Sequence, residues 1–285
     1  MERQLWKQIV ELIRQLGKRR FNPRCQFQAD VIVKVWMWGV IHDRPVSWSC
    51  RAGNWPPWAR FRKPSETTMS RRLRSPEVVA LLKVVEERVC QSEEGGTVWM
   101  IDGKPLVISG CSTDRQAGYG RATGGKAKGY KLHAIVGANG SVAQWRVAPM
   151  NVDERRMARR MLKAAAIAGY VIGDGNYDSN PLHAICDERG NLQFVTPRRY
   201  GAGKGFGHRK QTAGRMRSVE ILENPFAEFG KQLLKQRLTI ERFFSRLTTW
   251  GGGLTHLPPW IRTHRRVHRW IQAKLIINAI RINTQ

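Results

Sequence analysis

The chain has 285 residues, with 49 lysines and arginines against 22 acidic residues, and its formal net charge is +27. Hydrophobic residues make up 41% of the sequence, which is enough for a folded core and excludes a disordered basic tail. Such a charge would repel itself without a polyanionic partner, and nucleic acid is the simplest candidate. No apolar run approaches the about 20 residues of a membrane span, so we expect no membrane partner. Five scattered cysteines without a Cys-x-x-Cys pair favour a reduced, cytoplasmic protein.

Residues 1–93 have the pattern of a mostly helical region. The apolar residues of LWKQIVELIRQL (5–16) recur at intervals of three and four, which predicts an amphipathic helix. The denser apolar segment DVIVKVWMWGVIH (30–42) predicts a buried helix. A third helix begins at Ser75-Pro76-Glu77, with proline at its first position.

A short basic helix is predicted between the last two. Ser65 is its expected N-cap and Glu66 lies in its first turn. A short polar helix with an arginine cluster, preceded by another helix, is typical of an element that reads a DNA groove, although a solvated basic helix end is an equal alternative. The residues expected to contact bases are Arg71, Arg72 and Arg74, and those expected to hold the DNA backbone are Arg60, Arg62 and Lys63.

From residue 97 the pattern changes to strands. Segments 97–109, 129–137 and 141–149 predict an antiparallel meander, the last two joined by an Asn-Gly turn at 139–140. A helix over 151–169 follows, in which Asn151 and Glu154 have the spacing of a capping box. A short strand before Asp174, a helix near 181–188 and a strand at LQFVTP (192–197) complete an α/β fold with a mixed sheet covered by helices.

The last third of the chain is basic and helical. Residues 198–217 hold seven lysines and arginines and five glycines without a carboxylate, which predicts a basic loop. Helices are expected over 230–247 and 258–280. In the first, Leu233, Ile240, Phe244 and Leu247 form one apolar stripe, with Glu241 at its margin one helical turn beyond Arg237.

Three carboxylates suggest a metal site. Asp102 and Asp174 each follow a predicted strand and stand beside glycine, and clustered buried carboxylates need a counterion. Mg²⁺ prefers such oxygen ligands, and with Glu241 as a third carboxylate two ions would support in-line displacement at phosphorus. The alternatives are that the two aspartates are turn residues and that Glu241 and Arg237 form an exposed helix pair of little consequence.

Five segments carry a resemblance. MIDGKPL, GYKLHAIV, VAPMNVDE, IGDGNYDS and QRLTIERFFSRL, in this order, resemble the DDE transposases of bacterial insertion sequences over residues 97–250. The resemblance implies a ribonuclease-H-like catalytic domain at 97–285, containing the basic loop and C-terminal helices, after a DNA-end-binding region at 1–93. It implies Asp102, Asp174 and Glu241 as a catalytic triad holding two Mg²⁺ (or Mn²⁺) ions. Arg237 matches the family's arginine, whereas Leu234 and Thr248 stand where many relatives have tyrosine and lysine.

The resulting hypothesis is a DNA transposase that hydrolyses the phosphodiester at the ends of its element and transfers the 3′ hydroxyl to target DNA. A homodimer or higher multimer on DNA, in the bacterial cytoplasm with the nucleoid, is expected. The alternatives are a metal-dependent nuclease of the same fold and an inactive DNA-binding relative. The intact triad argues against the inactive relative. Further DNA contacts are expected from Arg237, Lys126, Lys128, Lys131 and His133, although a histidine on a strand is more often structural.

Overall fold

The computed structural model describes residues 2–17, 25–90, 96–110, 112–199, 210–224, 228–249, 254 and 256–282. The chain divides into two compact units. The first consists of Met1–Gln91 with Arg246–Gln285, and the second of Ser92–Ser245. No helix within the described ranges has the length and apolar character needed to cross a membrane.

The first unit is helical, as predicted for the N-terminal part. Its core holds a cluster of tryptophans: the ring centroids of Trp6 and Trp38 lie 5.0 Å apart, and Trp38 stacks on Trp55 at 4.7 Å. Ser65 caps α4 by accepting a hydrogen bond from the backbone N–H of Thr68 at 3.3 Å, as its sequence position predicts. The elements are α1 (Glu2–Gly17), α2 (Ala29–Ile41), α3 (Val46–Ser49), η2 (Ala52–Asn54), η3 (Pro57–Ala59), α4 (Glu66–Arg72), α5 (Pro76–Cys90) and α11 (His264–Ile282).

The C-terminal helix α11 belongs to this unit, whereas the sequence was interpreted as one domain over 97–285. The reason is its apolar surface, which packs against α5 and α2. Trp270 lies against Trp36 of α2, with ring centroids 5.8 Å apart. Lys274 of α11 is fully buried, and its Nζ donates to the carbonyl of Val40 at 3.0 Å and pairs with Asp43. Tertiary contacts over more than 200 residues of sequence separation therefore decide where α11 belongs.

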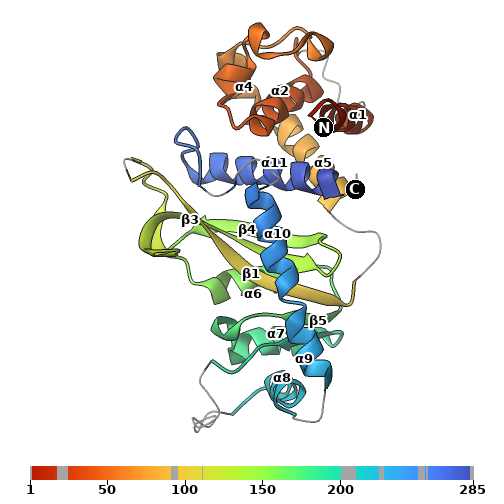
Figure 1. The fold of residues 1–285 in the computed structure, drawn as a ribbon, viewed down its shortest axis with the longest axis vertical. Coiled ribbons are helices and arrows are strands. Elements are labelled where there is room, and N and C mark those ends of the chain that lie inside the picture. Colours follow the sequence, from red (N-terminus) through yellow and green to blue (C-terminus); the bar gives the residue numbers. More distant parts are fainter. Residues whose placement is uncertain are drawn as a thin grey trace. The chain divides into compact units, whose positions relative to one another are not determined.

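The second unit is built on a six-stranded mixed sheet (Figure 1). The predicted meander is confirmed: β1 pairs antiparallel with β3, and β3 pairs antiparallel with β4. On the other edge of β1, β5 and then β6 pair in parallel. The strands are β1 (Val98–Val107), β2 (Gly118–Ala122), β3 (Gly125–Gly137), β4 (Val142–Pro149), β5 (Gly169–Ile172) and β6 (Leu192–Val195). No local pattern predicts β2, GYGRA, because two of its five residues are glycine.

Helices flank the sheet. One face of the sheet is covered by α6 and α7, whose apolar residues pack with Ile101, Ile135 and Phe194 in a single core. α8 packs on β6 and on α7. The elements are α6 (Glu154–Ala164), η4 (Gly175–Tyr177), α7 (Asn180–Arg189), α8 (Ala213–Glu223), α9 (Glu228–Lys235) and α10 (Leu238–Thr249). The predicted mixed sheet between helices is thus confirmed.

Three predicted helices have different limits. The helix expected over 258–280 is α11, which begins only at His264. The helix expected over 151–169 is α6, which ends at Ala164, and its N-cap is Asp153, not Asn151. The helix expected over 230–247 is broken by a turn at Gln236 and Arg237, which separates α9 from α10. The predicted apolar stripe is nevertheless buried throughout. Of the basic loop predicted over 198–217, residues 200–209 lie outside the described part of the chain, and residues 213–217 are not loop but the start of α8.

Candidate active site

The two predicted catalytic aspartates meet where β1 and β5 stop pairing. The parallel pairing of these strands ends at Met100 and Ile172, so Asp102 and Asp174 each lie two residues beyond the last pair. Both line one open pocket at this edge of the sheet. β1 itself continues, and Asp102 pairs with Ala134 of β3, which excludes the alternative of a turn residue for Asp102. Asp174 does leave its strand and caps the short helix η4.

Four segments contribute to the pocket: the middle of β1, the β2–β3 hairpin, the start of α6 and the loop after β5. The charged residues that line it are Asp102, Arg121, Lys131, Glu154 and Asp174. The third carboxylate, Glu154, was expected only as part of a helix cap. Its place in the pocket could not be inferred from the sequence, because it depends on how α6 packs on β3.

The environment of Asp102 disfavours its charge. Burial raises the pKa of Asp102 to about 6, and the negative charges of Asp174 and Glu154 act in the same direction. The backbone N–H of Gly103, which donates to Asp102 Oδ1 at 2.7 Å, and the charge of Arg237 oppose this. Asp174 accepts hydrogen bonds from the backbone N–H and the side-chain amide of Asn176, at 2.9 and 3.2 Å. Burial and the neighbouring carboxylates therefore disfavour the charged form of Asp102 despite the charge of Arg237.

Arg237 and Glu241 differ in their relation to this pocket. Arg237 occupies the turn between α9 and α10, and its charge acts on Asp102. Glu241 lies in the first turn of α10 with an exposed side chain, and it does not line the pocket. Among the residues that the structure describes, no three His, Cys, Asp or Glu side chains are grouped closely enough to hold a metal ion. The structure therefore brings together Asp102 and Asp174 but not Glu241.

The glycine beside Asp102 makes room for neighbouring protein side chains. A Cβ atom at Gly103 would lie 2.9 Å from Cδ of Lys131 and 3.2 Å from Nδ1 of His133. Likewise, a Cβ atom at Gly173 would lie 3.3 Å from side-chain atoms of Ile101 and Phe194. Both glycines thus allow close packing around the sheet's edge.

The two strand residues predicted to face DNA are buried. His133 has no exposed surface, and burial together with the charge of Lys131 lowers its pKa to about 4. Within the described residues neither ring nitrogen of His133 has a hydrogen-bond partner. Lys131 is 9% exposed and forms an ion pair with Glu154. Of the hairpin lysines, Lys126 is exposed and Lys128 is half-buried.

The predicted DNA-contacting residues of the first unit also differ in exposure. Arg71 and Arg74 are exposed, as are Arg60 and Arg62. Arg72 is mostly covered, and its guanidinium lies 3.5 Å from the carboxylate of Glu77. Lys63 is half-buried, with Nζ 4.3 Å from the ring centroid of Trp55. Packing of Arg72 and Lys63 within the unit makes them less available for DNA than the sequence suggests.

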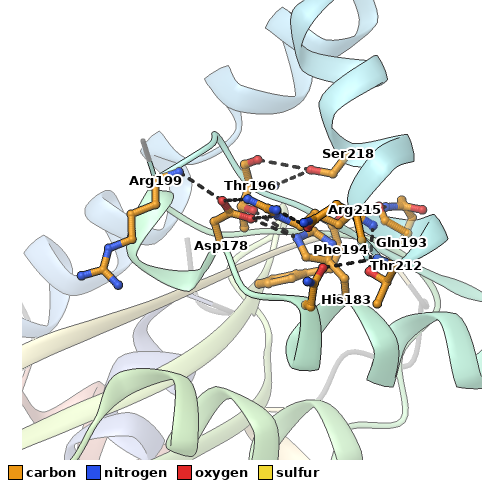
Figure 2. Close-up of polar contacts among 12 residues, drawn as sticks. Asp178, His183, Gln193, Phe194, Thr196, Arg199, Thr212, Arg215 and Ser218 are labelled. Atoms are coloured by element: carbon orange, nitrogen blue, oxygen red, sulfur yellow. Dashed lines mark hydrogen bonds and ion pairs between the residues drawn. The ribbon is translucent and has the colours of Figure 1, made fainter. Parts of the chain in front are cut away.

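A buried polar network supports the loop that follows Asp174 (Figure 2). The carboxylate of Asp178 accepts two hydrogen bonds from the guanidinium of Arg215, at 2.7 and 2.6 Å, and one from the backbone N–H of Arg199 at 3.1 Å. His183 Nε2 lies 3.7 Å from the same carboxylate. A neighbouring bond joins Ser218 Oγ of α8 to the backbone N–H of Thr196 at 2.9 Å. The network connects α8 to the segments that follow β5 and β6.

The ion pair of Asp178 with Arg215 was not predicted from the sequence. Burial raises its pKa, but the hydrogen bonds from Arg215, His183 and the Arg199 N–H, with the charge of Arg215, outweigh burial and hold the pKa of Asp178 well below its usual range. Its partner is 37 residues away in the sequence. No local pattern predicts such a pair.

Comparison with known proteins identifies the family. The family model of the transposase DDE domain matches residues 94–278. The chain therefore belongs to this family, and the resemblance that its five segments carry is confirmed. A solved piggyBac transposase, in a synaptic complex with hairpin DNA, is similar with a TM-score of 0.48 and 10% identity, over 99% of this chain and 72% of that chain. No curated protein matches the chain.

Proposed function

We propose that this DDE transposase binds the ends of its own element, hydrolyses the phosphodiester there and transfers the resulting 3′ hydroxyl to target DNA. The observation that carries the proposal is the meeting of Asp102 and Asp174 in one pocket, within the segment that matches the transposase DDE domain. The order of the strands, an antiparallel meander followed by two parallel strands, is consistent with a ribonuclease-H-like catalytic domain. The net charge of +27 suits a DNA substrate.

The chemistry of the donor set fits a divalent metal. Asp102 and Asp174 are oxygen ligands, and the pKa of Asp102 is raised because burial and its acidic neighbours outweigh the Gly103 N–H and the charge of Arg237. Mg²⁺ and Mn²⁺ are suited to such ligands. We assign Asp102, Asp174 and Glu241 as the residues that would hold two ions. When bound, such ions would activate the attacking oxygen and stabilise the leaving one.

The chain's own residues would prepare this site. The Gly103 N–H fixes the carboxylate of Asp102, and the backbone N–H and side-chain amide of Asn176 fix that of Asp174, by direct hydrogen bonds. Arg237, whose charge reaches Asp102, is placed to attract the scissile phosphate. Glu241 would have to approach the pocket when DNA binds, since its side chain is exposed.

DNA recognition is assigned to exposed basic residues on both units. Arg71 and Arg74 would read bases at the element's end, and Arg60 and Arg62 would hold its backbone. On the second unit, Lys126 and Arg121 lie opposite each other on the β2–β3 hairpin, where they can contact phosphates near the pocket. A dimer or higher multimer on DNA is part of the proposal, and native mass spectrometry of the DNA complex tests it.

The test measures cutting and joining separately with the full-length protein. A labelled duplex that carries the element's end is incubated with Mg²⁺, with and without target DNA. We expect cleavage followed by joined products, and loss of both in Asp102→Asn, Asp174→Asn and Glu241→Gln. Glu188→Gln, a carboxylate change on an exposed position of α7, is the matched control. Cleavage without joining would instead identify a metal-dependent nuclease, and near-normal cleavage by one variant would remove that residue from the triad.

A further inference from the structure

Glu154 is not needed for the task that its sequence position suggests. In a capping box it would reach back to the backbone at the start of its helix. In the structure, the N-cap of α6 is Asp153, whose side chain accepts a hydrogen bond from the backbone N–H of Arg156 at 3.1 Å. Glu154 is thereby free to turn toward the sheet, and its carboxylate pairs with Nζ of Lys131. Both residues line the pocket of Asp102 and Asp174.

The position of Lys131 is built into the sheet. Its side chain crosses the space left by Gly103, where a Cβ atom would lie 2.9 Å from Cδ of Lys131. The side chain of Lys131 is 11% exposed and that of Glu154 27%. An ion pair this far removed from water gains little stability, because the cost of desolvation offsets the attraction. The placement of a lysine among three carboxylates therefore calls for another explanation.

We propose that Glu154 is a further metal ligand of the pocket and that Lys131 is an internal cation, which neutralises Glu154 until a divalent ion replaces it. The proposal rests on the proposed function, since it concerns the same pocket. Exchange of Lys131 for the metal would add Glu154 to the oxygen ligands Asp102 and Asp174 of the same pocket.

The experiment measures metal affinity instead of activity. Mn²⁺ binding to the full-length protein without DNA is titrated by electron paramagnetic resonance, for the wild type and for Glu154→Gln, Lys131→Met and the double variant. Loss of a side chain that supports a metal ligand typically weakens affinity by about 10–100-fold, which sets the scale expected for loss of one ligand among several. We expect Glu154→Gln to fall in this range and Lys131→Met to strengthen binding, because Glu154 then has no competing cation.

The double variant separates ligand exchange from a general effect of charge. If Lys131 acts by pairing with Glu154, the effects of the two substitutions on Mn²⁺ affinity are not additive. Lys131→Met then changes the affinity of the Glu154→Gln variant by no more than about twofold. If Lys131 acts only through its charge at a distance, its removal strengthens binding equally in both backgrounds, and the proposal is overturned. Unchanged affinity in Glu154→Gln overturns it as well.

Two controls keep these outcomes interpretable. Glu154→Asp keeps a carboxylate with a shorter reach, so its affinity is expected between those of the wild type and Glu154→Gln, whereas a variant damaged in α6 would lose near-ultraviolet circular dichroism before any metal is added. Asp102→Asn tests the proposed function itself. If Asp102→Asn binds Mn²⁺ with the affinity of the wild type, the assignment of this pocket as the metal site is wrong. If Asp102→Asn loses Mn²⁺ affinity and Glu154→Gln does not, only the inference about Glu154 fails.

Discussion

Replacement of Arg215 by methionine tests whether the buried pair with Asp178 supports the loop next to Asp174. The change removes the guanidinium that donates at 2.7 and 2.6 Å but keeps a side chain of similar reach. The side chain of Asp178 is only 3% exposed, so its charge would be left buried. Breaking a buried pair by removing one partner typically costs about 3–5 kcal/mol. Because Asp178 keeps the hydrogen bond from the Arg199 N–H and Arg215 is 17% exposed, we expect about 3 kcal/mol, the lower end of that range.

The decrease in unfolding free energy caused by Arg215→Met should depend on pH. The pKa of Asp178 is held below its ordinary value in the folded protein, so the pair contributes its full stability above the unfolded value, which is about 3.9 for aspartate. This contribution is lost as the pH falls through the folded pKa. In Arg215→Met the buried carboxyl instead becomes easier to protonate. Both effects make the difference in unfolding free energy between wild type and variant smaller at pH 3 than at pH 7.

The assay must follow the second unit by itself, because the chain has two units. The full-length protein is equilibrated in urea at each pH, labelled by a short hydrogen-exchange pulse at one fixed pH, and analysed through peptides covering residues 170–196. Arg217→Met is the matched control on the same helix: Arg217 is 52% exposed and pairs with Asp187, so its loss should cost at most about 1 kcal/mol. The reasoning would be refuted if Arg215→Met lowered the free energy of unfolding by no more than Arg217→Met does. It would also be refuted if the decrease in Arg215→Met were the same at pH 3 and at pH 7.

Three further predictions concern DNA. Asp174→Asn should abolish strand cleavage while a filter-binding assay shows affinity for the element's end within a few-fold of wild type; loss of both together would place Asp174 in DNA binding or folding. Affinity should fall by about 10³–10⁵ between 50 and 200 mM salt if 6–10 phosphates are contacted, and a flat salt titration would contradict the dominance of phosphate contacts. Arg71→Ala should weaken binding to the element's end by about 1–3 kcal/mol more than binding to unrelated DNA, whereas Arg62→Ala should weaken both alike. Footprints that do not change in Arg71→Ala would exclude it as a base reader. Removal of residues 1–93 is unsuitable for this purpose, because it would expose the apolar surface of α11.

Local patterns predicted the elements that carry the candidate site. Alternation and the Asn-Gly turn predicted the meander of β1, β3 and β4, and Ser65 predicted the start of α4. The sequence also placed Asp102 and Asp174 at the ends of apolar strand segments. Because these segments became adjacent parallel strands, the two carboxylates meet at the same edge of the sheet. Such features depend on hydrogen bonds and side-chain periodicity within a few residues, which a single sequence records.

Only the tertiary structure decided which charged groups share an environment. Glu154 faces Lys131 and Asp178 faces Arg215, although the partners of each pair are 23 and 37 residues apart in the sequence. His133, which was predicted to contact DNA, is buried, and Glu241 is exposed and does not line the pocket. α11 joined the N-terminal helices because its apolar surface fits α2 and α5. Charge neutralisation and burial depend on which elements pack together, and the sequence pattern of one element does not indicate which other elements pack against it.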